Sequence, residues 1–539
     1  MNGMIIWVQL FIFMNNINKK TYILFLLIIF LSSAYIKFFN ASYVFTSYDD
    51  IGVITLFKSF LGEKIINLNF IFFEKKIILD EIFFSGFENN ILLSAFIFWT
   101  WTYAPLQYIF YLFFDIANQD FQTKIFLSRL PSIIFSLLSM VCFLIIMNKL
   151  RFNKITKLIS LCILAYSFNV NVHANHAAPY SAYIFSGFFG LLNLLNYNKK
   201  NYSKKYLLFN NISLYLSYSN IVLFLCFLFI EFKKKNIIYF FKELFTKYKI
   251  FIVANLLIIL PVIIKFLFSG NKANMLYRSE DSYQSLLWVN EFFTNFYPVM
   301  KFILVGFFNE TLFIFFIISL IVLSLISIKN KKFKFNLLSK CSLIFVTFWI
   351  LLSFFKILPF GESRHSLILL PFVLMILSNI IENVIPNKKL ILLPLLILIV
   401  YSSLSNINIL KSKNSIFDFE ILKNSKLDIY TYGATLEPFL LKDFGNKIYN
   451  TEVNSFLNNQ KLWSNTSNEI YLVSTFETLS EKFKRKNKFF KLLKDNYKIE
   501  IISEKTTKIT YSYKNNCCYQ AGNMPVSQNN FYLYKLTKK

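Results

Sequence analysis

Long apolar runs follow one another along the chain up to residue 407, and short polar segments separate them. Their lengths approach the roughly 20 residues that an α-helix needs to cross a bilayer. We therefore predict a polytopic α-helical membrane protein with about 11 transmembrane helices. The spans are placed at 21–39, 125–147, 157–175, 179–196, 206–217, 219–231, 249–268, 309–328, 338–358, 366–383 and 390–407. The short pair 206–217 and 219–231 has a re-entrant hairpin as an alternative.

Three regions follow from this pattern. Residues 1–20 form a cytoplasmic or interfacial N-terminus, because their apolar stretch is too short to span and their positive charge follows it, unlike in a cleaved signal peptide. Residues 21–407 form the transmembrane domain, and 40–124 is its first outer loop. Two more apolar segments, 99–118 and 284–305, are predicted to be helices that lie along the outer face of the membrane.

Beyond residue 407 the pattern changes to alternating strand-like and helix-like segments. Strands are predicted at 428–433, 469–474, 497–513 and 531–536, and helices at 435–444 and 478–496. This alternation predicts a small soluble α/β domain over 408–539. The domain contains neither a G-x-G-x-x-G turn nor a phosphate-binding P-loop.

Composition excludes an ordinary soluble enzyme and a disordered chain. Hydrophobic residues make up 56% of the 539 residues and charged residues 16%, whereas soluble proteins have about 25% charged residues. The formal net charge of +28 would indicate a nucleic-acid partner in a soluble protein. Here the Lys residues lie mostly in short loops between apolar helices, as the positive-inside rule describes, so no nucleic-acid partner is expected.

The distribution of positive charge also predicts the orientation in the membrane. The loops assigned to the cytoplasmic side hold more than twice as many Lys and Arg residues as the longer loops assigned to the outside. The N-terminus is therefore expected in the cytoplasm, and the C-terminal domain is expected to be extracytoplasmic.

Two adjacent carboxylates, Asp49 and Asp50, follow the first span at the outer membrane boundary. A hydroxyl group is a poor nucleophile until a positioned base takes its proton, and a carboxylate at this boundary suits that role. A second acidic pair, Asp80-Glu81, lies in a Lys-flanked amphipathic stretch, where a solvated helix face is the favoured interpretation. Asp49 is therefore the leading candidate base and Asp50 the next, although the capping of a following helix also explains an Asp pair.

Other unusual polar residues fall on the same predicted face. Arg129 opens one span, and Arg364 lies between two late spans. His173, His176 and Tyr180 lie at the connection between two further spans. Arg and His side chains there could hold a lipid phosphate, while each taken singly is more often a snorkelling or capping residue.

The order of these elements resembles the GT-C superfamily of membrane glycosyltransferases. It is most similar to the bacterial protein O-mannosyltransferase and aminoarabinose (lipid A) transferase family. An acidic pair after the first span is matched by Asp49-Asp50, and an Arg-Leu-Pro-Ser element by 129–132. A Pro-Pro-Leu-Tyr-like turn is matched by 104–108, where Ala104 replaces the first Pro. A Pro-Tyr element is matched by Pro179-Tyr180, and a late span with an Arg and a Pro by 364–371.

The resemblance implies a bacterial inner (plasma) membrane enzyme that takes a sugar from a polyprenyl-phosphate-linked donor. The sugar would pass, by in-line inverting displacement, to a hydroxyl of a lipid, glycan or protein acceptor. Asp49, with Asp50 beside it, would be the catalytic base, and no cofactor is implied. The donor and its phosphate would be bound by Arg129, Arg364, Tyr103, Lys272 and Arg278, and the acceptor or cavity would be lined by His173, His176, Tyr180 and Tyr108.

Several alternatives stay open at this point. Lys272 and Arg278 are also explained as surface charges that face lipid headgroups. His173 and His176 have the spacing of a zinc pair, but no third ligand is evident nearby, so a metal is not expected. The chain departs from the family where His176 and Ala178 replace an acidic residue and an Arg. A polysaccharide or lipid-linked glycan flippase, or a glycan ligase, is the alternative function, although a flippase needs charges inside its spans and this chain has few.

Overall fold

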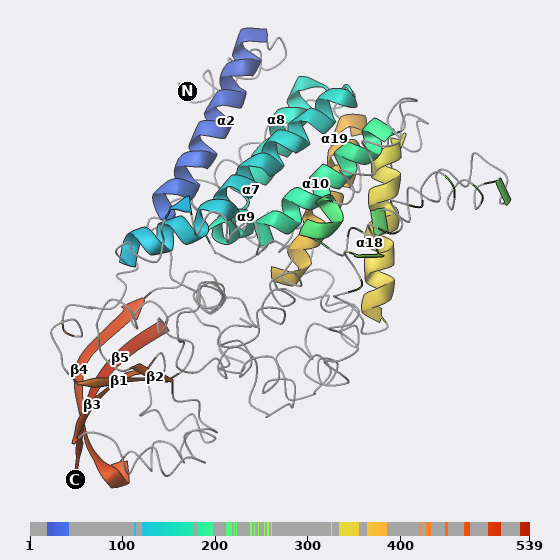
Figure 1. Ribbon diagram of the computed structural model, residues 1–539. Helices are drawn as coiled ribbons and strands as arrows, with labels where there is room; N and C mark the ends of the chain where they lie inside the picture. Colours follow the sequence, from blue (N-terminus) through green and yellow to red (C-terminus); the bar gives the residue numbers. More distant parts are fainter. Residues whose placement is uncertain are drawn as a thin grey trace, which may run out of the picture.

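The computed structural model describes two groups of secondary structure, a bundle of helices and a five-stranded sheet (Figure 1). The residues that it describes are 19–41, 113–114, 121–175, 180–197, 212–217, 220, 222–223, 334–354, 364–384, 427–432, 448–450, 468–474, 494–507 and 529–539, with single positions at 238, 239, 242, 246, 249, 253, 256, 257, 260, 325 and 421.

Three helices of the described segments are long and apolar enough to cross a membrane. They are Lys19–Phe39 in α2 (Lys19–Asn40), Phe126–Lys149 in α7 (Phe121–Lys149), and Ser366–Asn383, where the 3₁₀ helix η7 (Arg364–Leu369) continues into α19 (Leu370–Val384). They coincide with the predicted spans 21–39, 125–147 and 366–383. Large apolar side chains of α2 are exposed, among them Leu24, Leu27 and Leu31. An exposed apolar surface of this kind is compatible with surrounding lipid, so the described helices agree with a membrane protein.

Four more helices belong to the described bundle, namely α8 (Lys154–Tyr166), α9 (Phe168–Ala174), α10 (Tyr180–Tyr197) and α18 (Leu337–Phe354). The predicted span 157–175 is wrong as one continuous helix, because Ser167 separates α8 from α9. The Ser167 N–H bonds the Ile163 carbonyl at 3.0 Å, and the Ser167 carbonyl accepts the Asn171 N–H at 3.0 Å. Ser and Asn are weak helix formers that compete for backbone hydrogen bonds, which favours a break here.

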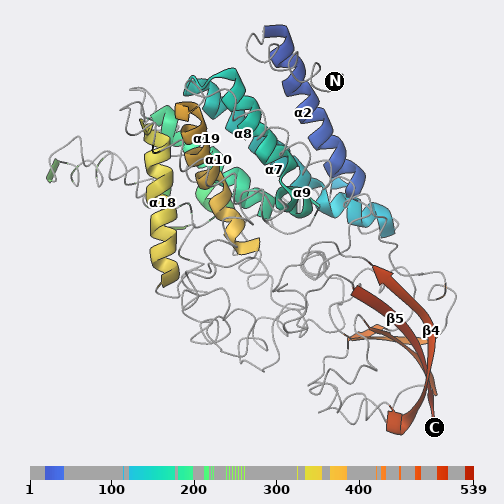
Figure 2. The ribbon, with the colours of Figure 1, turned by 180° about the vertical axis from the view of Figure 1, so that it is seen from behind.

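The two ends of the bundle differ chemically. The end of α2, the start of α7, α9 and the start of α10 lie together at what we call the Arg129 end, which is the lower end of α2, α7 and α10 in both views (Figure 1, Figure 2). The opposite Lys149 end holds the start of α2, the α7–α8 turn and the last turns of α10 and α19. Lys149 Nζ donates to Asn196 Oδ1 there at 2.8 Å. Exposed cations gather at this second end, at Lys19, Lys20, Lys149, Arg151 and Lys154.

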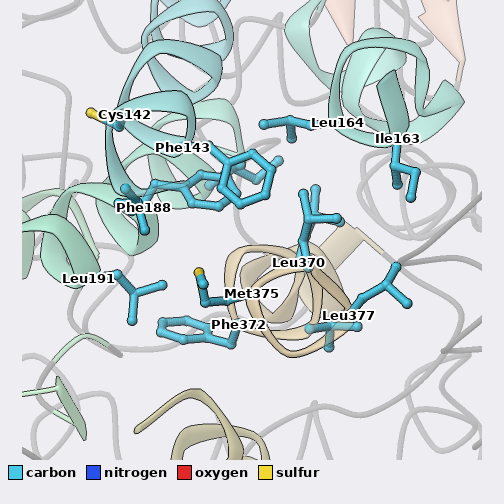
Figure 3. Packing of buried hydrophobic residues seen from close by; sticks show 14 of the residues in the cluster. Cys142, Phe143, Ile163, Leu164, Phe188, Leu191, Leu370, Phe372, Met375 and Leu377 are labelled. Carbon is cyan, nitrogen blue, oxygen red and sulfur yellow. The ribbon is translucent and has the colours of Figure 1, made fainter. Parts of the chain in front are cut away.

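An apolar core joins α7, α8, α10 and α19 between these ends (Figure 3). Phe143 of α7 lies against Phe188 of α10, with ring centroids 4.9 Å apart. At Gly187 of α10 an added Cβ would lie 2.7 Å from Pro371 Cγ of α19, so only glycine permits this approach. Small residues at contacts are typical of membrane helices, because lipid supplies no hydrophobic force between them. The contact fixes α19 against α10, and with it the backbone of Arg364 at the start of η7.

A polar turn lies buried beside α10. Asn220 Nδ2 donates to Ser186 Oγ and to Ser213 Oγ, each at 2.9 Å, and Ser213 Oγ donates to the Ser186 carbonyl at 2.8 Å. The Asn220 N–H also bonds the Ser217 carbonyl at 3.0 Å. Non-helical backbone at membrane depth is tolerated only where protein satisfies its polar groups. These bonds are what a re-entrant connection over the short pair 206–217 and 219–231 would need.

The C-terminal part contains a mixed sheet in the order β2-β1-β3-β5-β4. Its strands are β1 (Asp428–Tyr432), β2 (Ile448–Asn450), β3 (Glu469–Ser474), β4 (Tyr497–Thr507) and β5 (Asn529–Lys538). Strands β1, β3, β4 and β5 confirm the four sequence predictions, while the three-residue β2 is too short to carry an alternating pattern. Lys535 of β5 pairs with Glu469 of β3 at 3.0 Å, and this hydrogen-bonded carboxylate raises the pKa of Lys535.

Several predictions lie wholly or largely outside the described residues. They are the N-terminus 1–20, the first outer loop 40–124, the outer-face helices 99–118 and 284–305, the spans 219–231, 249–268, 309–328 and 390–407, and the tail helices 435–444 and 478–496.

Candidate functional site

Arg129 lies in the first turns of α7 with its side chain completely buried. Its Nη1 donates a hydrogen bond to the backbone carbonyl of Ala41 at 2.7 Å, which ties the start of α7 to the end of α2. Pro131 follows in the same helix, and because Pro has no N–H, the Leu127 carbonyl loses its usual helical bond. The sequence placed Arg129 at the boundary of a span, and the structure places it inside the protein at the Arg129 end.

Lys37 is a second buried cation at the same end, and the sequence analysis missed it. Its side chain is 0% exposed, and its ammonium donates to Ser33 Oγ one turn earlier on α2. Ser33 in turn donates to the Ala165 carbonyl of α8 at 3.2 Å. The available signal was a single Lys close to the end of an otherwise apolar span. An ionisable residue there is a functional candidate by default.

Lys37 and the backbone partner of Arg129 both belong to the last part of α2 and the residue after it. Ala41, whose carbonyl accepts the Arg129 bond, directly follows α2, whereas the Lys37 ammonium reaches one turn back to Ser33, whose Oγ lies 3.4 Å from Met140 Sδ of α7. The described residues of the helical bundle contain one acid, Glu382, and its carboxylate accepts the Asn153 N–H at the Lys149 end, at 3.0 and 3.2 Å. Among the described residues, the Arg129 end therefore holds two buried basic side chains and no acid.

His173 and Tyr180 are brought into direct contact at this end. His173 ends α9 and Tyr180 begins α10, and their rings meet edge to face with centroids 5.0 Å apart. Ser181 Oγ donates to the His173 carbonyl at 3.2 Å and holds the two helices together. Both side chains are buried, at 2% and 6% exposure. The structure therefore agrees with the prediction that His173 and Tyr180 lie together where two helices connect.

Two asparagines of the same segment were also missed by the sequence analysis. Asn171 and Asn175 are buried, and their amide oxygens have no hydrogen-bond partner among the described residues. Asn175 Nδ2 donates to the Asn171 carbonyl at 2.7 Å. A buried amide oxygen normally accepts a hydrogen bond, so each is available to a hydroxyl donor. The sequence feature that could have indicated them is the alternation of Asn with apolar residues at 169–175. The sequence analysis selected the two nearby His residues instead.

The remaining predicted site residues are only partly described. Arg364 begins η7, and its side chain is outside the description. Also outside the described residues lie Asp49, Asp50, Tyr103, Tyr108, His176, Lys272 and Arg278. The structure therefore brings His173 and Tyr180 into contact, and it places Arg129 on α7 and Lys37 on α2, two helices that pack against α9.

The described side chains of this end suit an anion better than a metal. Cationic and amide groups dominate it, and within the described segments no three His, Cys, Asp or Glu side chains come together. No protein-family model matches the chain, and a search of curated proteins gives no significant match. The described helices are compatible with a membrane protein, and they bury a guanidinium and a lysine near one end of the bundle.

Proposed function

We propose that the chain is a membrane glycosyltransferase similar to the GT-C superfamily, which moves a sugar from a polyprenyl-phosphate-linked donor to an acceptor hydroxyl. One observation supports this most strongly, the buried Arg129 guanidinium fixed at Ala41, where α2 leads into the acidic segment with Asp49 and Asp50. A guanidinium is well suited to a phosphate, because its planar fork donates two parallel hydrogen bonds.

The proposed reaction exchanges one bond at the anomeric carbon. Asp49 accepts the proton of the acceptor hydroxyl, and the hydroxyl oxygen forms the new bond to the anomeric carbon from the face opposite the phosphate. The bond between the anomeric carbon and the phosphate oxygen breaks, and its electron pair leaves with the polyprenyl phosphate. Arg129 and Arg364 stabilise the charge that this phosphate gains, and configuration inverts at the anomeric carbon.

The acceptor is assigned to the region around α9 and α10. His173 and Tyr180 would line its cavity together with His176 and Tyr108, while Tyr103, Lys272 and Arg278 would complete donor binding. The buried amide oxygens of Asn171 and Asn175 would accept hydrogen bonds from hydroxyl groups of the sugar or acceptor.

The proposed location is a bacterial inner (plasma) membrane, with the N-terminus in the cytoplasm and the Arg129 end outside. This orientation is supported by the exposed cations at the Lys149 end, since cytoplasmic ends carry an excess of Lys and Arg. The complete protein would have about 11 spans. The C-terminal residues 408–539 would form an extracytoplasmic α/β domain that recognises the acceptor or covers the site.

Reconstituted vesicles test this function directly. The purified protein is inserted into phosphatidylcholine vesicles that contain a polyprenyl-phosphate sugar, and extracted membrane lipid, glycan and protein acceptors are added in turn. We expect covalent transfer of the sugar and release of polyprenyl monophosphate. Crossing of the sugar lipid between leaflets without any covalent transfer would establish a flippase instead, and transfer only from pyrophosphate-linked glycans would establish a ligase.

A further inference from the structure

We infer that Ser167, Asn171 and Asn175 form a row of hydrogen-bond acceptors for the hydroxyl groups of a saccharide, and that the acceptor substrate is a saccharide. The inference rests on the proposed glycosyltransferase function and narrows its acceptor class. It adds Ser167, the residue at the break between α8 and α9, which none of the motifs shared with the GT-C family includes.

The three residues lie at successive turns along one side of α9. The Asn171 N–H bonds the Ser167 carbonyl at 3.0 Å, and Asn175 Nδ2 donates to the Asn171 carbonyl at 2.7 Å, so each asparagine is bonded to the residue four positions before it. Residues four positions apart are neighbours on a helix, and eight positions correspond to about 12 Å. The row therefore runs along the whole of α9.

Each residue of the row carries a buried oxygen without a hydrogen-bond partner among the described residues. The atoms are Ser167 Oγ, Asn171 Oδ1 and Asn175 Oδ1, and the three residues are 4%, 2% and 0% exposed. Such an oxygen is costly unless a donor reaches it. Ser136 Oγ of α7 and Ser342 Oγ of α18 also lack a described partner, but no similar oxygen lies four positions from either.

The number of acceptors and the length of the row favour a saccharide. Amide oxygens take O–H or N–H donors. A serine or threonine of a protein acceptor offers a single hydroxyl, whereas a sugar ring carries hydroxyls on adjacent carbons and linked rings extend them further. The row is longer than the single ring of a polyprenyl-phosphate sugar. Part of it is therefore left for the sugar of the acceptor.

The row leads from the interior of the bundle toward the connection to α10. Ser167 lies two residues beyond Ala165, whose carbonyl accepts a hydrogen bond from Ser33 of α2, and Asn175 directly follows α9. Because all three oxygens are buried, a saccharide reaches them only when α9 moves away from its neighbours. Ser167 has non-helical backbone angles, φ −54° and ψ 123°, and is the position at which such a movement can hinge.

Acceptor kinetics test this assignment. Sugar transfer from a polyprenyl-phosphate sugar to the extracted membrane glycan is measured in reconstituted vesicles, and donor affinity is measured without acceptor. We expect Ser167→Ala to raise KM for the glycan about five- to tenfold, the effect of one lost hydrogen bond, and to change donor affinity less than about twofold. Ser139→Ala is the matched control and should change neither quantity, since Ser139 is a buried serine of α7 whose Oγ already donates to the Phe135 carbonyl at 2.8 Å.

A second variant separates the hydrogen bond from the shape of the side chain. Ser167→Cys has a side chain of similar size but a weak acceptor, and it should raise KM for the glycan as Ser167→Ala does. Without acceptor, both variants should melt at the wild-type temperature or above it, because the hydroxyl that they lose has no described partner.

Several results would overturn the row. Unchanged KM in both variants would exclude Ser167 from binding, and equal weakening of donor and glycan would make its role structural. A lower melting temperature of Ser167→Ala without acceptor would show that water in the free protein supplies the hydroxyl donor. A wild-type protein that prefers protein acceptors to the glycan would exclude a saccharide acceptor.

These results leave the proposed function standing as long as the wild-type protein binds the polyprenyl-phosphate sugar and transfers its sugar to any acceptor. A wild-type protein that does neither would overturn the proposed function along with the row.

Discussion

Arg129 Nη1 donates a hydrogen bond of 2.7 Å to the Ala41 carbonyl and so connects residues that are 88 positions apart in the chain. Ala41 is the last described residue before the segment that carries Asp49 and Asp50. The bond therefore holds a phosphate-binding candidate at the point where the chain enters its acidic loop. In the proposed reaction the base Asp49 and the cation Arg129 act on the same sugar phosphate. This hydrogen bond links Arg129 to the start of the segment that carries Asp49.

Arg129→Lys is expected to reduce the rate of sugar transfer by about 100-fold, because loss of one donor to a developing oxyanion has that effect. Lysine keeps the charge but lacks the fork that could hold Ala41 and a phosphate at once. The measurement is kcat/KM with a polyprenyl-phosphate sugar in reconstituted vesicles.

Arg151→Lys is the matched control for this substitution. Arg151 follows α7 at the Lys149 end, where its side chain is exposed, and its replacement should change kcat/KM less than about twofold. Equal effects of the two substitutions would show that Arg129 acts through general charge or stability and not at the site.

Gly187→Ala is expected to lower the free energy of unfolding by about 1–3 kcal/mol, because overpacking strains a tight contact. Its Cβ would lie 2.7 Å from Pro371 Cγ and 3.0 Å from Pro371 Cβ, and a proline ring cannot rotate away. Gly190→Ala should cost less, since its nearest neighbour is the flexible end of Leu223. Thermal unfolding in detergent gives the order, and a larger loss for Gly190→Ala would contradict it.

Asn153→Ala is expected to destabilise the start of α8 by about 1 kcal/mol. Asn153 Oδ1 caps the helix by accepting the Thr156 N–H at 2.8 Å. Asn153→Ser keeps a capping oxygen and should retain most of the stability. Because the cap lies at the Lys149 end, neither variant should change the affinity for a polyprenyl monophosphate, and a change in affinity would contradict the location of the site.

Asn171→Leu separates a binding role from a structural one. The amide oxygen of Asn171 has no described hydrogen-bond partner, so its replacement by an apolar side chain with the same branching should leave thermal stability unchanged or raise it. Sugar transfer should nevertheless fall at least about tenfold, because a hydroxyl of the substrate loses its acceptor. Wild-type transfer by a stable Asn171→Leu protein would exclude Asn171 from the site.

Truncation after residue 408 tests whether donor binding belongs to the transmembrane domain and acceptor recognition to the C-terminal domain. The shortened protein should keep the stabilisation that polyprenyl monophosphate gives to the full chain, because Arg129 remains. Transfer should shift among lipid, glycan and protein acceptors, since acceptor recognition is assigned to the removed domain. Loss of the lipid-induced rise in melting temperature would show that the C-terminal domain takes part in donor binding.

Helix positions could be predicted from the sequence where the apolar pattern is long. The spans at 21–39, 125–147 and 366–383 agree with α2, α7 and the η7–α19 pair, because a membrane helix needs an unbroken apolar run. The break at Ser167 was missed, since an apolar window averages over a single capping residue. Four strands were predicted by their alternation, and β2 was too short for such a pattern.

The candidate site was less accessible from the sequence. Arg129, His173 and Tyr180 were selected because each interrupts an apolar pattern near a predicted boundary, and the structure places them at one end of the bundle. Lys37 and Asn171 interrupt apolar patterns as well, but their significance depends on contacts between helices. A single span cannot show that Lys37 is buried beside Ser33 and not exposed to lipid, because that depends on how α2 rotates against α7 and α8.

The most direct test of the account is mass spectrometry of the lipids that copurify with wild-type protein and with Asp49→Asn. We predict a polyprenyl monophosphate that carries one sugar in both samples, with more of it in Asp49→Asn because donor binds and is not consumed. This result would identify the sugar and connect Asp49 to turnover. Only pyrophosphate-linked glycans, or ordinary phospholipids with no difference between the two proteins, would contradict a polyprenyl-phosphate-dependent glycosyltransferase.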